Sequence, residues 1–328
     1  DSATGDLENE LVYWIPRVFK DDCFVAAPYK TTPAVQRTFR ITDRTEISGQ
    51  VQEFWQKRAG SRELDGSRLE VWDDGKIGNI SVKYFPVDHS VPGAGAFCIK
   101  TTDGWVIYTG DLRLHGKRAQ DTRQFIKAAA ELKPLALICE GTNPIEGWPM
   151  SEAALSENAR LAIRAESSYV IVSFAPRNLE RLNTFLTIGK ETGRQLVVTA
   201  CQAYLLQNLK LCGVSPLNVE NILIYGEAKA ARATWERVLM ESFSDMVITP
   251  ARIKANPGNY ILCLGYYDLN QLADLSPAGG TYLYSCSEAH DEEAEIDLRR
   301  LENWTREFGL KLYGHTKNNN LHSGGHIH

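Results

Sequence analysis

The sequence predicts an α/β protein built on two sheets of different construction. In the first 145 residues, short apolar strands follow one another across tight turns, which favours an antiparallel or mixed sheet. After residue 145, strands alternate with helices, which is typical of a parallel sheet covered on both faces. The 328 residues suffice for one large or two ordinary domains with sizeable cores.

The first half is predicted to contain a run of strands and one helix after residue 79. The strands are Ile80–Val87, Gly95–Thr101, Gly104–Gly110 and Leu135–Gly141, and the helix is Thr122–Leu132. Thr102-Asp103-Gly104 is a favourable hairpin turn between the second and third strands. Upstream, Ile47–Lys57 has the spacing of an amphipathic helix, and Trp14, Phe19 and Tyr29 are expected in a core.

The second half is predicted to be a series of strand and helix pairs. Its helices are Ser151–Ala165, Asn178–Thr192 and Asp291–Phe308, with further helices between, and its strands lie within Tyr169–Ala175, Gln195–Ala200, Asn221–Gly226, Asp245–Pro250, Tyr260–Tyr266, Thr281–Ser287 and Leu310–His315. Parallel sheets of this kind bind ligands at the carboxyl ends of their strands. We therefore expect functional residues directly after strands.

Composition narrows the functional classes. A formal net charge of −5 gives no global nucleic-acid signature, so nucleic-acid binding requires a local basic patch. The seven cysteines are odd in number, scattered and never spaced C-x-x-C, which favours free thiols in a reducing cytoplasm over disulfides or a thiolate zinc site. No apolar run reaches the roughly 18 residues of a membrane span, so no membrane partner is expected.

Two strand exits carry residues suited to metal binding. His89 follows the predicted strand Ile80–Val87, in a loop with Pro92, Gly93 and Gly95. Asp111 follows the predicted strand Gly104–Gly110, in "YTGDLRLHG". An imidazole and a carboxylate held by rigid strands suit zinc or manganese. The spacing alone equally allows an Asp111 that caps a turn and a His89 that is an ordinary loop residue.

Longer stretches around these residues resemble a known family. "DHSVPGAGAF" and "VIYTGDLRLHG" resemble the third and fourth metal-binding motifs of the metallo-β-lactamase fold. The continuation is similar to the β-CASP ribonucleases, of the ribonuclease J and mRNA cleavage-factor type. "LICEGTN" resembles their first β-CASP motif, "VIVSFAPRNLERL" their strand–loop–helix that holds RNA phosphates, and "HSGGH" their second motif.

The resemblance implies the domain organisation. Residues 1–145 would form a partial metallo-β-lactamase αββα sandwich, residues 146–312 an inserted β-CASP parallel-sheet α/β domain, and residues 313–328 the return to the first domain. The family's H-x-H-x-D-H motif and its last metal-binding histidine are absent. We therefore expect a chain truncated at both ends and inactive as given.

The resemblance also implies a function, the metal-dependent hydrolysis of RNA phosphodiester bonds. Two divalent metal ions, zinc by expectation, would be bound in part by His89 and Asp111. Asp111 and Glu140 would be catalytic together with His326, which would donate a proton or contact a phosphate oxygen. Because "HSGGH" has one glycine more than the usual motif, His322 is the alternative to His326, and it is otherwise expected to bind the substrate.

Basic and polar residues are predicted to bind the substrate. Ser173, Arg177, Asn178 and Arg181 lie where a strand passes into a helix N-terminus, a favourable place for a phosphate. Arg113, His115, Lys117 and Arg118 form a basic loop that is expected to guide an anionic backbone or to be merely solvated.

Other functions of the same fold stay open. A paralogue with an inactive metal site would bind RNA or dock a processing partner, and a small-molecule hydrolase would cleave an ester or thioester. Single-stranded RNA is the implied partner, with DNA as an alternative and a homodimer as an open assembly state.

Overall fold

The structure is a computed structural model that describes residues 79–91, 93–141, 150–211, 222–229, 231–286, 292–315 and 321. It also gives the backbone of strands β1 (Val12–Ile15), β2 (Cys23–Ala26) and β3 (Phe39–Ile41), which form an antiparallel sheet, and of β4 (Gly75–Ile77). The predicted helix Ile47–Lys57 lies outside the described residues, as do Phe19, Tyr29 and the side chain of Trp14.

The first sheet is mixed, as predicted, and has the order β4-β5-β6-β7-β8. Its strands are β5 (Ile80–Pro86), β6 (Gly95–Lys100), β7 (Trp105–Tyr108) and β8 (Ala136–Ile138), in addition to β4. Neighbours pair antiparallel except β7 and β8, which pair parallel. The turn after β6 is closed by the N–H of Thr101, which donates to the carbonyl of Gly104 at 2.9 Å.

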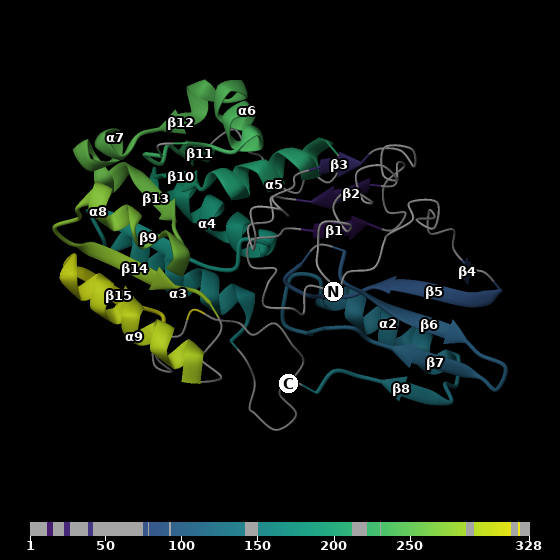
Figure 1. The fold of residues 1–328 in the computed structure, drawn as a ribbon. Helices are drawn as coiled ribbons and strands as arrows, with labels where there is room; N and C mark the ends of the chain where they lie inside the picture. Colours follow the sequence, from purple (N-terminus) through teal and green to yellow (C-terminus); the bar gives the residue numbers. More distant parts are fainter. Residues whose placement is uncertain are drawn as a thin grey trace.

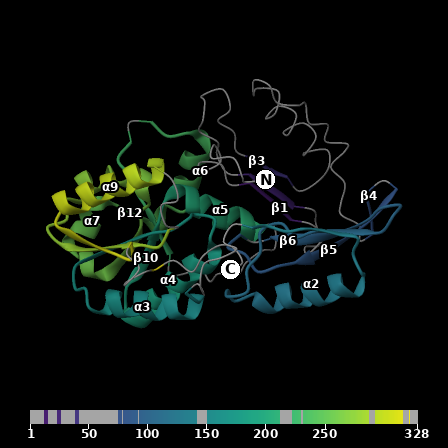
Figure 2. The ribbon, with the colours of Figure 1, turned by 90° about the horizontal axis from the view of Figure 1, so that it is seen from below.

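Helix α2 (Ala119–Glu131) covers one face of this sheet (Figure 2). Its Phe125 and Ala129 pack against Cys98 and Ile107, which alternate with outward-facing residues along their strands. This is the period-2 pattern expected of strands that bury one face.

The second sheet has seven strands, all parallel, in the order β12-β11-β10-β13-β9-β14-β15. The strands are β9 (Tyr169–Ser173), β10 (Gln195–Val198), β11 (Ile222–Tyr225), β12 (Val247–Ile248), β13 (Tyr260–Cys263), β14 (Gly280–Tyr284) and β15 (Leu310–Tyr313). β9 and β13 are buried along their whole length, which explains why they are continuous apolar runs in the sequence.

Helices cover both faces of the parallel sheet, as predicted. α3 (Glu152–Arg164), α4 (Leu179–Thr192) and α5 (Ala200–Leu211) lie on one face, and α7 (Pro250–Ala255), α8 (Gln271–Leu275) and α9 (Glu292–Glu307) on the other. α6 (Thr234–Ser242) packs on α5, and three short 3₁₀ turns are Ser244–Met246, Pro257–Asn259 and Tyr266–Asp268.

The two sheets present their carboxyl edges to each other. In Figure 1 the arrowheads of β5, β7 and β8 point toward the parallel sheet, and that of β14 points back toward them. Side-chain contacts confirm the arrangement, since Arg113 in the loop that follows β7 binds Glu180 at the start of α4. Residues at the exits of both sets of strands are therefore brought together.

Candidate functional site

The exits of three strands bring predicted site residues to one edge of the mixed sheet. β5 and β7 both run antiparallel to β6, so they run parallel to each other, and β8 runs parallel to β7. His89, Asp111 and Glu140 follow the ends of these strands by three, three and two residues. β5 and β7 are separated by one strand, or about 10 Å between axes. All three residues therefore share the edge that faces the parallel sheet.

The side chain of Glu140 holds the loop that carries Asp111. Oε1 of Glu140 accepts a hydrogen bond from the N–H of Leu112 at 2.6 Å, and the N–H of Glu140 donates to Oγ1 of Thr109 at 3.3 Å. Gly110 has a φ of +57°, and a Cβ there would lie 3.0 Å from a carbonyl oxygen of β6. Glycine is therefore strongly favoured at this turn, and the turn presents an exposed Asp111.

Asp88, which precedes His89, is fully buried and was not singled out from the sequence. Its Oδ2 accepts from the N–H of Gly116 at 2.7 Å, and its N–H donates to Oγ1 of Thr122 at 2.8 Å. Its carbonyl accepts from the N–H of Arg113 at 2.8 Å. This last bond ties the loop after β5 to the loop after β7, and thus joins the two segments that carry the predicted metal ligands.

The donor chemistry of these two segments fits a divalent cation in part. His89 and Asp111 are ligand types that zinc accepts, and they share one sheet edge. Within the described residues, no group of three or more His, Cys, Asp and Glu side chains is arranged to hold a metal ion. The carboxylate of Asp88 is already bonded to Arg113 and Gly116. A tetrahedral site takes four ligands, so the described residues supply only part of a set.

Arg113 differs from its predicted place in a solvent-facing loop. The predicted basic loop comprises Arg113, His115, Lys117 and Arg118. Arg113 is fully buried, and its Nε donates to Oδ1 of Asp88 at 3.3 Å. Nη1 donates to Oε1 of Glu152 at 3.2 Å, and Nη2 donates to Oε2 of Glu180. These acids lie 25, 39 and 67 residues from Arg113, so no local pattern could reveal that they neutralise it.

Two of the predicted phosphate-binding residues have partners inside the protein. The guanidinium of Arg181, whose residue is 1% exposed, donates to Oε1 of Glu152 at 2.9 Å and to the carbonyl of Ser285 at 3.0 Å. Oδ1 of Asn178 accepts from the N–H of Arg181 at 2.9 Å, so Asn178 is the N-cap of α4. Asn178 thus stabilises the start of this helix, whereas Arg181 joins the helix to α3 and to the residue that follows β14.

The other two predicted phosphate-binding residues differ in exposure. Ser173 is buried at the end of β9 and shares a 3.4 Å hydrogen bond with Sγ of Cys286. Burial raises the pKa of the Cys286 thiol, so this pair stays neutral at physiological pH. Arg177 is half-buried and directly precedes the N-cap of α4. It is the most accessible of the four residues.

The predicted histidines His322 and His326 lie outside the described residues. Leu321, which precedes His322 in the sequence, is buried at the carboxyl end of β14. Its carbonyl accepts from Nη1 of Arg181 at 3.2 Å and from Oγ of Ser285 at 2.6 Å. Leu321 is thus anchored to α4 and to the residue that follows β14.

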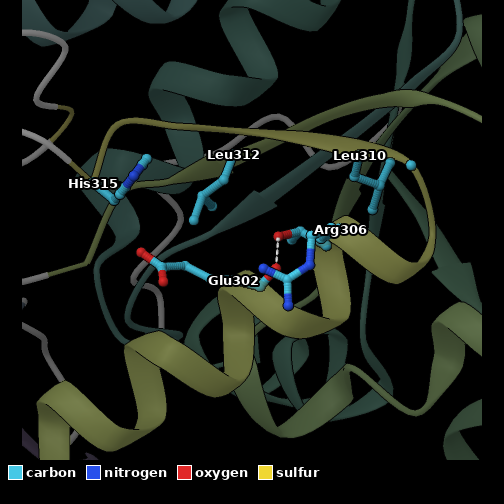
Figure 3. A pocket seen from close by; sticks show the side chains of 7 residues that line it. Glu302, Arg306, Leu310, Leu312 and His315 are labelled. Carbon is cyan, nitrogen blue, oxygen red and sulfur yellow. Dashed lines mark hydrogen bonds between the residues drawn. The ribbon is translucent and has the colours of Figure 1, made fainter.

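A shallow pocket of about 480 Å³ lies elsewhere, between α9 and the edge strand β15 (Figure 3). It is lined by Glu302, Thr305, Arg306, Gly309, Leu310, Leu312 and His315. None of the site residues predicted from the sequence lines this pocket. We therefore place the candidate site at the facing sheet edges.

The architecture, with one mixed sheet and one parallel sheet, is of the predicted α/β class and is consistent with a metallo-β-lactamase/β-CASP fold. A crystal structure of a protein of unknown function from Enterococcus faecalis V583 superposes on this chain with a TM-score of 0.58. The superposition covers 81% of this chain and 57% of the Enterococcus faecalis chain. The sequence identity is 22%, so the likeness concerns the fold alone.

Curated relatives confirm the resemblance to ribonuclease J. The chain is 28% identical to ribonuclease J of Mycoplasma pneumoniae over 139 residues, which are 40% of this chain and 24% of that protein. Ribonuclease J of Sinorhizobium meliloti is 28% identical over 152 residues, 43% of this chain and 26% of that protein. The matched part therefore spans about a quarter of the length of these relatives. No family model matches the chain.

Proposed function

We propose that this protein is a metal-dependent ribonuclease that hydrolyses phosphodiester bonds of single-stranded RNA. The observation that supports the proposal is the meeting of two strand-exit edges. One edge carries His89, Asp111 and Glu140, and the other carries Arg177 at the start of α4. The relatives called ribonuclease J give the substrate class.

His89 and Asp111 would bind divalent ions, with zinc the proposed metal. Bound metal ions would supply an activated water and would neutralise charge on the phosphate. The chain's own contribution is geometric. Glu140 fixes the Asp111 loop through Leu112, and the bond from Arg113 to the Asp88 carbonyl sets that loop beside His89.

Arg177 would contact the RNA backbone, because its guanidinium can form two parallel hydrogen bonds to a phosphate. Ser173, Asn178 and Arg181 would shape the same strand–loop–helix from inside, since all three are buried. His326 would protonate the leaving oxygen or contact a phosphate oxygen, and His322 is the alternative residue for this role.

We also propose the finer organisation. The metallo-β-lactamase part would extend to residue 145, and the β-CASP part from 146 to 312. The described cysteines Cys98, Cys139, Cys263 and Cys286 are free thiols, which supports a reducing, cytoplasmic setting. Among the described residues, no helix combines the length and the apolar character needed to cross a membrane.

The test is cleavage of labelled single-stranded RNA by the full-length protein, together with metal analysis. Asp111→Ala should lower kcat by about 100-fold or more and reduce the bound metal. Asp103→Ala, an exposed aspartate in the turn after β6, is the matched control and should cleave as the wild type does. Cleavage at the wild-type rate by Asp111→Ala would sink the proposal.

The same assay separates the alternatives. Wild-type protein that binds RNA without cleaving it would indicate an RNA-binding paralogue. Ester or thioester hydrolysis without RNA cleavage would indicate a small-molecule hydrolase. Single-stranded DNA of the same sequence, tested in parallel, decides which nucleic acid is the substrate.

A further inference from the structure

A cluster of buried charged side chains joins the two sheets. This buried charge cluster comprises Asp88, Arg113, Glu152, Glu180 and Arg181. The first two come from the loops after β5 and β7, and the other three from the first turns of α3 and α4. The Glu180 side chain is 13% exposed and the other four at most 3%. The cluster is thus an internal junction.

Glu152 is the shared centre of the cluster. Its Oε1 accepts from Nη1 of Arg113 at 3.2 Å and from Nη2 of Arg181 at 2.9 Å. One carboxylate oxygen therefore links a guanidinium of the mixed-sheet side to a guanidinium of the parallel-sheet side. Planar guanidinium groups fix both distance and direction in such contacts, more than an ammonium does.

The backbone reinforces the same junction. Oε1 of Glu180 accepts from the N–H of Lys117 at 2.8 Å, and the N–H of Glu152 donates to the carbonyl of His115 at 3.4 Å. The loop after β7 is therefore bonded to the first turns of both α3 and α4. The positive ends of these helix dipoles favour the two glutamates at their positions.

The cluster lies next to several of the predicted site residues in the sequence. Asp88 directly precedes His89, and Arg113 follows Asp111 by two residues. At the other end, Arg181 holds the carbonyl of Leu321, ahead of the "HSGGH" segment. A path of ion pairs and hydrogen bonds thus connects the two loops that carry the metal-ligand candidates with Leu321.

We infer that Arg113 and Arg181 are positioning residues which, through Glu152, set the alignment of the His89 and Asp111 edge with the RNA-binding half of the site. This inference rests on the proposed ribonuclease function for its kinetic consequence only. The alignment of the two sheets is a property of the protein without substrate. Neither arginine contacts RNA, because the guanidinium of each is buried among protein partners.

The test uses two variants that act on the cluster differently. Arg113→Lys keeps the charge but cannot bridge three carboxylates in fixed directions. Glu152→Gln keeps the shape but removes the charge shared by both arginines. Arg160→Lys is the matched control, because Arg160 also bonds two carboxylates, Glu157 and Glu191, but entirely within α3 and α4.

The first measurement is a distance distribution between the two parts of the full-length protein. Spin labels are introduced as unnatural amino acids at two exposed positions, Gln124 on α2 and Lys190 on α4, so that the native cysteines stay untouched. Arg113→Lys and Glu152→Gln should broaden or shift the distribution relative to wild type, and Arg160→Lys should leave it unchanged. If Arg113→Lys does not fold, Glu152→Gln decides the result.

The second measurement is RNA cleavage by the same proteins. Both cluster variants should lower kcat by about 10- to 100-fold, with KM within about twofold of wild type, since misalignment affects the reacting groups more than binding. A wild-type distance distribution or a wild-type kcat in Glu152→Gln overturns the inference. A wild-type protein that does not cleave RNA overturns the proposed function instead, while the distance measurement still tests the junction.

Discussion

At Gly116, a backbone N–H donates to the Asp88 carboxylate, and there is no room for a side chain. A Cβ at this position would overlap the carboxylate of Asp88 and the guanidinium of Arg113. We expect Gly116→Ala to lower the free energy of unfolding by roughly 1–3 kcal/mol, because both ion-pair partners must move. Chemical denaturation measures the change.

Gly141→Ala is the control for this substitution. Gly141 also follows a strand of the mixed sheet, and a Cβ there would meet no atom within 4 Å. Its change in stability should be small, within about 0.5 kcal/mol. If the two alanine variants were equally stable, the tight packing around Asp88 would be contradicted.

Glu180 gives the cluster a predictable pH dependence. Burial, which outweighs the attraction of Arg113, raises the pKa of the Glu180 carboxyl above its ordinary value. Between the pKa of Glu180 in the unfolded state and its higher pKa in the folded state, the folded protein keeps a proton that the unfolded protein has lost. The stability of the wild type therefore falls as the pH rises through this range. Glu180→Gln does not titrate. Its stability relative to wild type should therefore increase from about pH 4.5 upward and then level off.

Urea denaturation of the wild type and of Glu180→Gln between about pH 4 and pH 8 measures the difference in their free energies of unfolding. Groups that titrate alike in both proteins cancel in this comparison. A difference that is constant with pH, or that shrinks as pH rises, would contradict the raised pKa.

Single residues were predictable where a motif is contiguous in the sequence. His89 and Asp111 were singled out because each follows an apolar run, and Glu140 because "LICEGTN" resembles a family motif; the strand directions place all three at one edge. Asp88 and Glu152 carried no such signal, because the guanidinium that explains their burial comes from a distant segment. Long-range ion pairs of this kind leave no periodic trace in a sequence.

Among the elements, α4 shows how a local pattern fixes a boundary. The helix was predicted at Asn178–Thr192 and is found at Leu179–Thr192, with Asn178 as the N-cap and Gly193 in the left-handed region at φ +71°. Asn178→Ala should cost about 1 kcal/mol of stability, and Asn178→Asp should retain the cap. Thermal or urea unfolding of the pair checks this. Equal losses in both variants would show that the cap is not what Asn178 contributes.

Short edge strands were the least predictable elements. The stretch Leu135–Gly141 was expected as a strand, yet β8 covers only Ala136–Ile138 and is exposed along its length. β12 is a two-residue strand, although its apolar run is longer. Edge strands pair on one side only, so their length depends on the neighbour rather than on their own composition.

The molecule as a whole has cores of unequal size in its two parts. In the described residues, the mixed sheet buries a small cluster around Cys98 and Ile107, while the parallel sheet has an extensive core on each face. A small core alone is marginally stable. The mixed sheet should therefore draw part of its stability from its junction with the parallel sheet.

Native-state hydrogen exchange tests this dependence. Arg113→Lys should lower the protection of the Cys98 and Ile107 amides by roughly tenfold or more, because the smaller core opens once its buried ion pairs are weakened. The amides of Val170 and Ile261, in the centre of the parallel sheet, should keep their protection, since they lie in a far more extensive core. A uniform loss in both sheets would mean that the substitution destabilises the whole fold. Unchanged protection at Cys98 and Ile107 would mean that the mixed sheet is stable without the junction.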